Sequence, residues 1–82
     1  MSAQVVRREF ARQVNEARLA RHLSVRAVGR LARVPAATAQ GWLSGEHFPS
    51  PALRTNYLEL LDYLGLIGEL PAELHERLAG SA

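Results

Sequence analysis

The sequence predicts an all-α fold, a compact bundle of five short helices. Two patterns lead to this prediction. Apolar residues recur every three or four positions through most of the chain, which is the spacing of a buried helix face. No segment of useful length alternates apolar and polar residues, as a half-buried strand would. Proline, glycine and serine interrupt the periodic stretches, so each helix is expected to be short.

The size and composition of the chain limit the classes of function. Eighty-two residues, 48% of them hydrophobic and 22% charged, are typical of one globular domain and too few for a barrel or a two-domain enzyme. The chain has no cysteine, so it has neither a disulfide framework nor a thiolate ligand. No stretch approaches the roughly 20 apolar residues of a membrane helix, and no apolar segment follows Arg7 and Arg8. We expect a cytoplasmic protein that does not enter membranes.

The first two helices are expected over residues 4–21 and 25–33. The first carries apolar residues at spacings of four, four and three: Val6, Phe10, Val14 and Ala17. Ser24 precedes the second helix and is a favourable N-cap. The inner face of this second helix is expected to consist of Val28, Leu31 and Ala32.

Three more helices are expected in the second part of the chain. Pro35 suits the first turn of a helix over residues 36–43, and Gly45 suits its left-handed end. A fourth helix is expected over residues 51–64, with an inner face of Leu53, Tyr57, Leu60, Leu61 and Leu64. The fifth begins near Pro71 and uses Leu70, Leu74 and Leu78.

The two parts of the chain carry opposite charge. Residues 1–34 contain eight arginines and two glutamates, a balance of +6, whereas residues 35–82 contain two arginines and six carboxylates, a balance of −4. All ten basic residues are arginine, which suits bidentate phosphate contact, although GC-rich codons give the same bias. The asymmetry favours an anionic partner for the first part, nucleic acid foremost, or head-to-tail association between copies.

Residues 24–45 carry small and apolar residues at the offsets of a helix-turn-helix motif. Counted from Val25, the fourth, fifth, eighth, tenth, fifteenth and eighteenth positions are Val28, Gly29, Ala32, Val34, Ala39 and Trp42. Two helices that cross steeply must touch closely at one point, and Gly29 supplies the smallest residue there. Ala39 and Trp42 are expected to press the second helix of the motif onto the domain, which predicts that Trp42 is buried.

With these residues, the chain resembles the Xre family, the helix-turn-helix class of phage Cro and cI repressors. The resemblance runs from Phe10 through Leu66 and includes Leu23-Ser24, Thr38 and Trp42-Leu43-Ser44-Gly45. The chain is also similar to Xre-type domains at the N-terminus of large actinobacterial regulators, through Val34-Pro35, Phe48-Pro49-Ser50-Pro51 and Tyr57. It is then either a complete small protein or a module of a longer one.

Three positions depart from the family pattern. Val25 stands where members often have a glutamine that meets phosphate. Arg33 occupies the turn position, and His22 the end of the first helix, where glycine is usual. Arg33 must therefore adopt a left-handed conformation or a different turn.

The resemblance implies double-stranded DNA as partner, with the helix over residues 36–43 in the major groove. The residues expected to contact bases are Ala37, Thr38, Gln40 and Gly41. Those expected to contact phosphates are Ser24, Arg26 and Arg30, with Arg7, Arg8 and Arg12 as additions. Gln40 suits adenine, and the alanines suit thymine methyl groups. Because few of the outward side chains are polar, sequence discrimination is expected to be modest.

Such modules usually read two half-sites as a homodimer. The expected pairing surface lies in residues 51–79 and includes Leu58, Leu61, Tyr63, Leu66, Ile67 and Leu70. A rival interpretation is a protein-interaction or self-assembly module of the same fold that has lost base reading. A third is an antitoxin-like repressor, which binds DNA and also a protein partner.

Catalysis and metal binding find no support in the sequence. Ser44 lies in a Gly-Trp-Leu-Ser-Gly segment without the spacing of a nucleophile elbow, and no triad surrounds it. His22, His47 and His75 lie in separate segments without ligand spacing, and no glycine-rich phosphate loop is present. We expect no enzyme activity and no cofactor.

Overall fold

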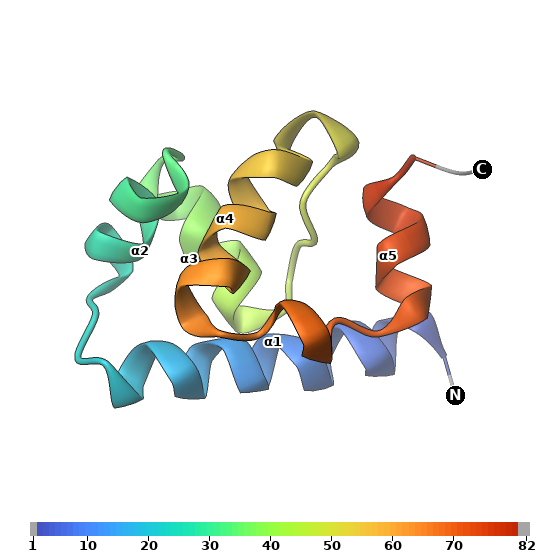
Figure 1. The fold of residues 1–82 in the computed structure, drawn as a ribbon, viewed down its shortest axis with the longest axis horizontal. Coiled ribbons are helices and arrows are strands. Elements are labelled where there is room, and N and C mark those ends of the chain that lie inside the picture. Colours follow the sequence, from blue (N-terminus) through green and yellow to red (C-terminus); the bar gives the residue numbers. More distant parts are fainter. Residues whose placement is uncertain (1, 81–82) are drawn as a thin grey trace.

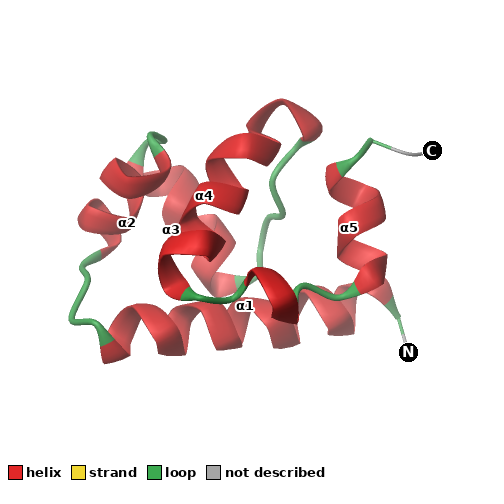
Figure 2. Ribbon diagram, viewed as in Figure 1, coloured by secondary structure: helices red, strands yellow, loops and turns green. Residues whose placement is uncertain are grey.

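The computed structural model describes residues 2–80 and confirms the all-α prediction (Figure 1). Its helices are α1 (Ala3–Ala20), α2 (Val25–Ala32), α3 (Ala36–Ser44), α4 (Arg54–Leu64) and α5 (Ala72–Leu78), with short 3-10 helices over Pro51–Leu53 and Ile67–Glu69. Figure 2 shows that loops join the helices, and the described residues contain no strand. Met1, Ser81 and Ala82 belong to the predicted domain 1–82 but lie outside the described residues.

Helix α1 is the longest helix, and three of the other helices pack on it. It contacts α3, α4 and α5, while α2 packs against α3 and α4. Figure 1 shows α2 at one end of the molecule and α5 at the other, near the beginning of α1. The whole domain measures 33 × 23 × 22 Å. Helix α2 of the predicted two-helix motif is therefore at the end of the domain that is far from α5.

The helix ends follow the predicted capping residues. The Ser24 hydroxyl accepts a hydrogen bond from the amide of Ala27 at 3.0 Å and caps α2, as expected. Helix α3 begins after Pro35, and α3 and α4 end at Gly45 and Gly65, both in the left-handed conformation. These caps satisfy backbone groups that the helix ends leave without partners.

All five helices contribute to the core. Its largest fully buried side chains are Phe10, Val14, Val28, Leu60, Leu61, Leu74 and Leu78. Trp42 is only 3% exposed, which confirms the prediction of a core position. Its ring meets Tyr57 edge to face at 5.2 Å between centroids, and Tyr57 meets Phe48 in the same manner at 5.5 Å. This aromatic cluster attaches α3 and the following loop to α4.

The turn between α2 and α3 brings two backbone segments into contact. The amide of Val34 donates a hydrogen bond to the carbonyl of Gly29 at 2.9 Å. A Cβ atom on Gly29 would lie 2.9 Å from the carbonyl oxygen of Val34 and 3.5 Å from the Cα of Ala36. Both neighbours are backbone atoms, so they cannot rotate away. The expectation that the crossing requires a residue without a side chain at Gly29 is confirmed.

Two residues adopt the left-handed conformation without being glycine. His22 has φ 56° and Arg33 has φ 58°, and no other described non-glycine residue has positive φ. At these two positions the Xre family, which the sequence resembles, usually has glycine. Arg33 ends α2, and its guanidinium donates to both carboxylate oxygens of Glu59 on α4, each at 2.9 Å. The turn geometry is thus kept at a cost of about 1–2 kcal/mol per residue.

The predicted pairing surface is smaller than expected. Leu61 and Leu70 were expected on this surface, but they are 0% and 7% exposed and belong to the core. Leu58 and Leu66 are half-buried, while Tyr63 and Ile67 are exposed. The difference arises because α5 and the 3-10 helix Ile67–Glu69 fold back over the bundle, so that the domain itself covers leucines that a lone helix would expose.

The close contact at Gly29 predicts the effect of one added methyl group. Gly29→Ala is expected to destabilise the domain by about 1–3 kcal/mol, because overpacking against backbone outweighs alanine's better helix propensity. Urea unfolding followed by circular dichroism measures this difference. The control is Gly68→Ala, since a Cβ there meets nothing within 4 Å. Equal stability of Gly29→Ala and the wild type would contradict the close contact.

Candidate nucleic-acid interface

Helix α3 has one buried and one exposed face. Ala39, Trp42 and Leu43 are buried. The exposed positions are Ala36, Ala37, Gln40 and Ser44. Thr38 is half-buried at the edge of this face. Of the four residues expected to contact bases, Ala37 and Gln40 are therefore accessible and Thr38 is partly so.

Gly41, the fourth of these residues, is buried, so its expected outward position is wrong. The chain folds back after α3, and the His47 imidazole lies on Gly41: a Cβ there would be 2.7 Å from Cδ2 of His47. His47 itself is exposed. From the sequence, His47 was considered only as a metal ligand, and its spacing from the other histidines did not support that role. A glycine inside a short helix was the available signal, because it lowers helix stability and often marks a close packing contact.

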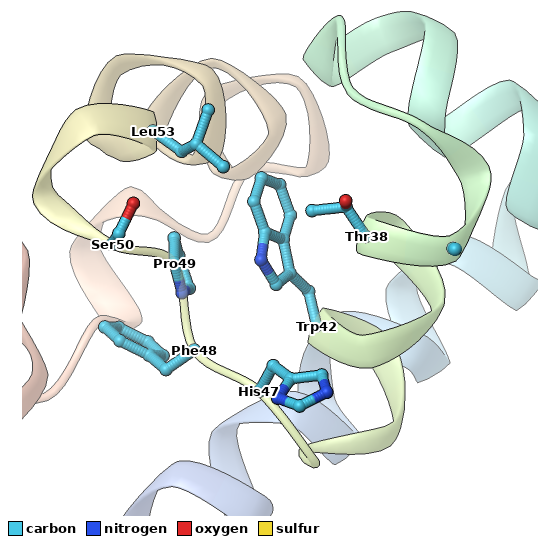
Figure 3. Close-up of a pocket in the computed structure, with 8 residues that line it drawn as sticks. Thr38, Trp42, His47, Phe48, Pro49, Ser50 and Leu53 are labelled. Carbon is cyan, nitrogen blue, oxygen red and sulfur yellow. The ribbon is translucent and has the colours of Figure 1, made fainter.

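A cavity of about 370 Å³ opens beside α3 (Figure 3). It is lined by Ala37, Thr38, Trp42, His47, Phe48, Pro49, Ser50 and Leu53. Figure 3 shows the Trp42 side chain between Thr38 on one side and Pro49 and Leu53 on the other. The cavity is thus lined on one side by Ala37 and Thr38 of α3 and on the other by the loop that leads into α4.

Helix α2 carries two exposed arginines, Arg26 and Arg30, one helical turn apart on the same side. Within residues 2–80 neither of them forms an ion pair, a side-chain hydrogen bond or a stacking contact. The Ser24 oxygen accepts from the α2 backbone, so its hydroxyl proton is available to an outside acceptor. Of these phosphate candidates, Ser24 lies at the beginning of α2, and Arg26 and Arg30 lie along the helix.

The three arginine candidates of α1 differ in their surroundings. Arg12 pairs with Glu9 and Glu16 on the same helix. A hydrogen bond from Arg12 lowers the pKa of Glu9, and the same hydrogen bond, together with the charges of both glutamates, raises the pKa of Arg12. Arg7 is half-buried, with a buried Nε that has no partner among the described residues.

Arg8 is exposed and lies where α1 passes the end of α3. A Cβ built on Gly45 would be 3.3 Å from the Cα of Arg8. Arg8 is therefore the residue of α1 that the fold brings next to the motif with its charge unpaired in the described part of the chain.

Three other arginines form contacts within the domain. Arg18 donates to the Asn15 side chain and to the carbonyl of Leu23. The Arg21 guanidinium lies 5.9 Å from the ring centre of Tyr63, and that of Arg77 lies 6.0 Å from the ring centre of Phe48. These contacts hold the ends of α1 and α5 in place.

Carboxylates collect on the outer side of α4. Glu59 and Asp62 line an open groove of about 580 Å³ together with Arg54, Thr55, Leu58 and Ile67. The charge asymmetry of the sequence thus becomes a spatial one, with free arginines on α2 and carboxylates on α4. No group of three metal-ligating side chains occurs among residues 2–80, and none of their helices is long and apolar enough to cross a membrane.

Tyr57, which supports Trp42 from α4, has its pKa raised above the usual value because burial disfavours the charged phenolate. A group whose pKa is higher in the folded state contributes stability below its unfolded pKa and loses it as the pH rises above that value. The chain contains neither lysine nor cysteine, so no lysine or thiol ionisation overlaps with that of the buried Tyr57 phenol.

The domain is therefore expected to lose stability above about pH 10, and Tyr57→Phe is expected to remove most of this loss. Urea midpoints measured between pH 8 and 11.5 test this. Tyr63→Phe is the matched control, because Tyr63 is exposed and its loss is expected to leave the alkaline decline unchanged. A Tyr57→Phe protein that declines as steeply as the wild type would contradict the assignment.

Comparison with protein-family models, with curated proteins and with solved structures finds no match for this chain. The features available are the exposed face of α3, the two free arginines of α2 and the imidazole of His47, which all lie on or beside the two-helix motif.

Proposed function

We propose that this chain is a double-stranded DNA-binding domain that inserts α3 into the major groove. The observation that carries the proposal is the α2–α3 crossing at Gly29, which buries Trp42 and Ala39 and turns the opposite face of α3 to solvent beside free arginines. The major groove is about 12 Å wide and admits one α-helix. A helix presented in this manner is the element that helix-turn-helix proteins use.

The exposed side chains of α3 suit a close approach to DNA. Ala36 and Ala37 are small, so the helix can lie deep in the groove and contact thymine methyl groups. Gln40 offers both a donor and an acceptor, the pair that matches the edge of adenine. Thr38, at the half-buried edge, adds one hydroxyl. The face contains little polar chemistry, so base discrimination is expected to be modest.

Phosphate contact supplies most of the affinity in this proposal. Ser24, Arg26 and Arg30 reach the backbone beside the groove, and Arg8 reaches it from α1. Arg12 has its charge compensated by two glutamates, so we assign it no phosphate contact. Arg7 is half-buried and is not assigned one either. The phosphate-binding set thus contains fewer residues of α1 than the sequence predicted.

The resemblance to the Xre family supports the same interpretation. Two positions at which that family usually has glycine, His22 and Arg33, have positive φ here. The backbone at these positions is therefore what a glycine-containing turn would have. On this basis we propose a Cro/cI-type domain of a cytoplasmic transcriptional regulator, paired as a homodimer through the exposed Tyr63 and Ile67.

The groove on α4 favours a second candidate function, a protein-interaction module. Its Asp62 carboxylate lies with the apolar Leu58 and Ile67, a composition suited to a basic partner segment, whereas Glu59 is already paired with Arg33. In this alternative the small residues on α3 would contact protein instead of bases. The two functions differ in their dependence on duplex DNA and on salt.

The DNA-binding proposal predicts the effect of removing cations from α2. Arg26→Gln and Arg30→Gln should weaken binding to every duplex about equally, and each should lower the slope of log K against log salt by about 0.9. Fluorescence anisotropy with labelled duplexes between 50 and 200 mM salt measures both effects. Arg12→Gln removes the same charge from a residue already paired, so its slope is expected to stay near that of the wild type.

Gln40→Ala should act differently from the arginine variants. It is expected to reduce the preference among sequences by about 1–3 kcal/mol and to leave non-specific binding unchanged. The interaction-module alternative expects no duplex binding tighter than about 10⁻⁴ M at low salt. That result, with the protein still folded, would refute the DNA-binding proposal and direct the search to the groove on α4.

A further inference from the structure

We propose that His47 reads a base edge in the major groove, in place of the side chain that Gly41 lacks. This inference rests on the proposed DNA-binding function and extends it to a residue outside α3. The reading surface then consists of the exposed face of α3 and one imidazole supplied by the following loop.

Hydrogen bonds hold His47 on α3. The carbonyl of Gly41 accepts from the amides of Gly45 and His47, at 3.1 and 3.2 Å, and from the Ser44 hydroxyl at 3.2 Å. The Ser44 oxygen accepts in turn from the amide of Glu46 at 3.3 Å. Gly45 has φ 82°, which reverses the chain immediately after the helix. The residues from Ser44 to His47 are thus fixed to the last turn of α3. The position of His47 therefore follows from the backbone geometry.

The imidazole occupies the place of a residue on α3. A Cβ on Gly41 would lie 2.7 Å from Cδ2 of His47 and 3.4 Å from its Cβ and Cγ atoms, so one edge of the ring covers this glycine. On a helix, position 41 adjoins positions 37 and 44, which are both exposed. The ring therefore continues the face that is proposed to enter the groove.

The ring nitrogens of His47 are chemically free. Neither of them has a hydrogen-bond partner within residues 2–80, and the residue is exposed. A neutral imidazole has one donor and one acceptor. Purine N7 and guanine O6 are acceptors on the major-groove edge, so an N–H of His47 finds a partner there.

The exposed face of α3 has few side chains that can form hydrogen bonds with bases. Ser44 already uses its hydroxyl within the loop, and Thr38 is half-buried. Without His47, Gln40 would be the one long polar side chain on this face of α3. A purine contact from His47 would double the number of long hydrogen-bonding side chains available to bases.

The test begins with a duplex that the wild-type protein selects from a random pool. His47→Ala is expected to lose about tenfold in affinity for this duplex and to bind a scrambled duplex as the wild type does. His47→Gln keeps a donor and should recover part of the loss. His75→Ala on α5 is the matched control and should bind both duplexes normally. Thermal melting of each variant verifies that it is folded.

Gly41→Ala provides an independent test, because it leaves the imidazole in the protein and displaces it from its place. This variant should reduce preference for the selected duplex as His47→Ala does. The double variant Gly41→Ala/His47→Ala should lose no more than His47→Ala alone, since both changes remove one interaction. Alanine favours helix over glycine, so α3 is retained.

Three results would overturn the proposal. One is a His47→Ala protein that distinguishes the two duplexes as well as the wild type. Another is equal weakening on both duplexes with a lower salt slope, which identifies a phosphate contact instead. In both cases the wild type still binds DNA, so the proposed function stands. A wild-type protein that binds no duplex refutes the proposed function and this inference together.

Discussion

The contact between the backbones of Gly29 and Val34 determines the arrangement of the rest of the domain. It fixes how α2 crosses α3, because the missing side chain at Gly29 lets a carbonyl oxygen come within 2.9 Å of where a Cβ would be. With this crossing set, Trp42 packs on Tyr57 and the opposite face of α3 is exposed. The left-handed conformation of Arg33 is a consequence, since the chain must turn sharply to make the contact. Stability and the proposed function therefore depend on the same few backbone atoms.

Partners within the domain, more than the number of cations, decide which arginines can serve a ligand. Arginines that form ion pairs, hydrogen bonds or ring contacts inside the domain are Arg12, Arg18, Arg21, Arg33 and Arg77. Arg12 and Arg33 pair with carboxylates, and the other three are engaged in hydrogen bonds or ring contacts. Arg26 and Arg30 have no such partner among the described residues, and they lie on α2, which packs against α3. A strongly cationic sequence segment thus yields a much smaller cationic surface.

The sequence predicted those features that depend on local spacing. Helix periodicity, the Ser24 cap, the small residue at Gly29 and the burial of Trp42 follow from residue type and position along one or two helices. A contact that depends on a reversal of the chain was missed. The imidazole of His47 covers Gly41 because the chain reverses at Gly45, and a helical projection of α3 contains no information about this reversal.

The central claim is that a duplex binds the exposed face of α2 and α3. Its most direct test is a titration of the ¹⁵N-labelled domain with a short duplex at low salt, followed by amide chemical shifts. The largest changes are predicted for the amides of α2, α3 and His47, with α5 unaffected. Changes confined to the groove of Leu58, Glu59 and Ile67 on the α4 side, or no change at excess duplex, would contradict the account.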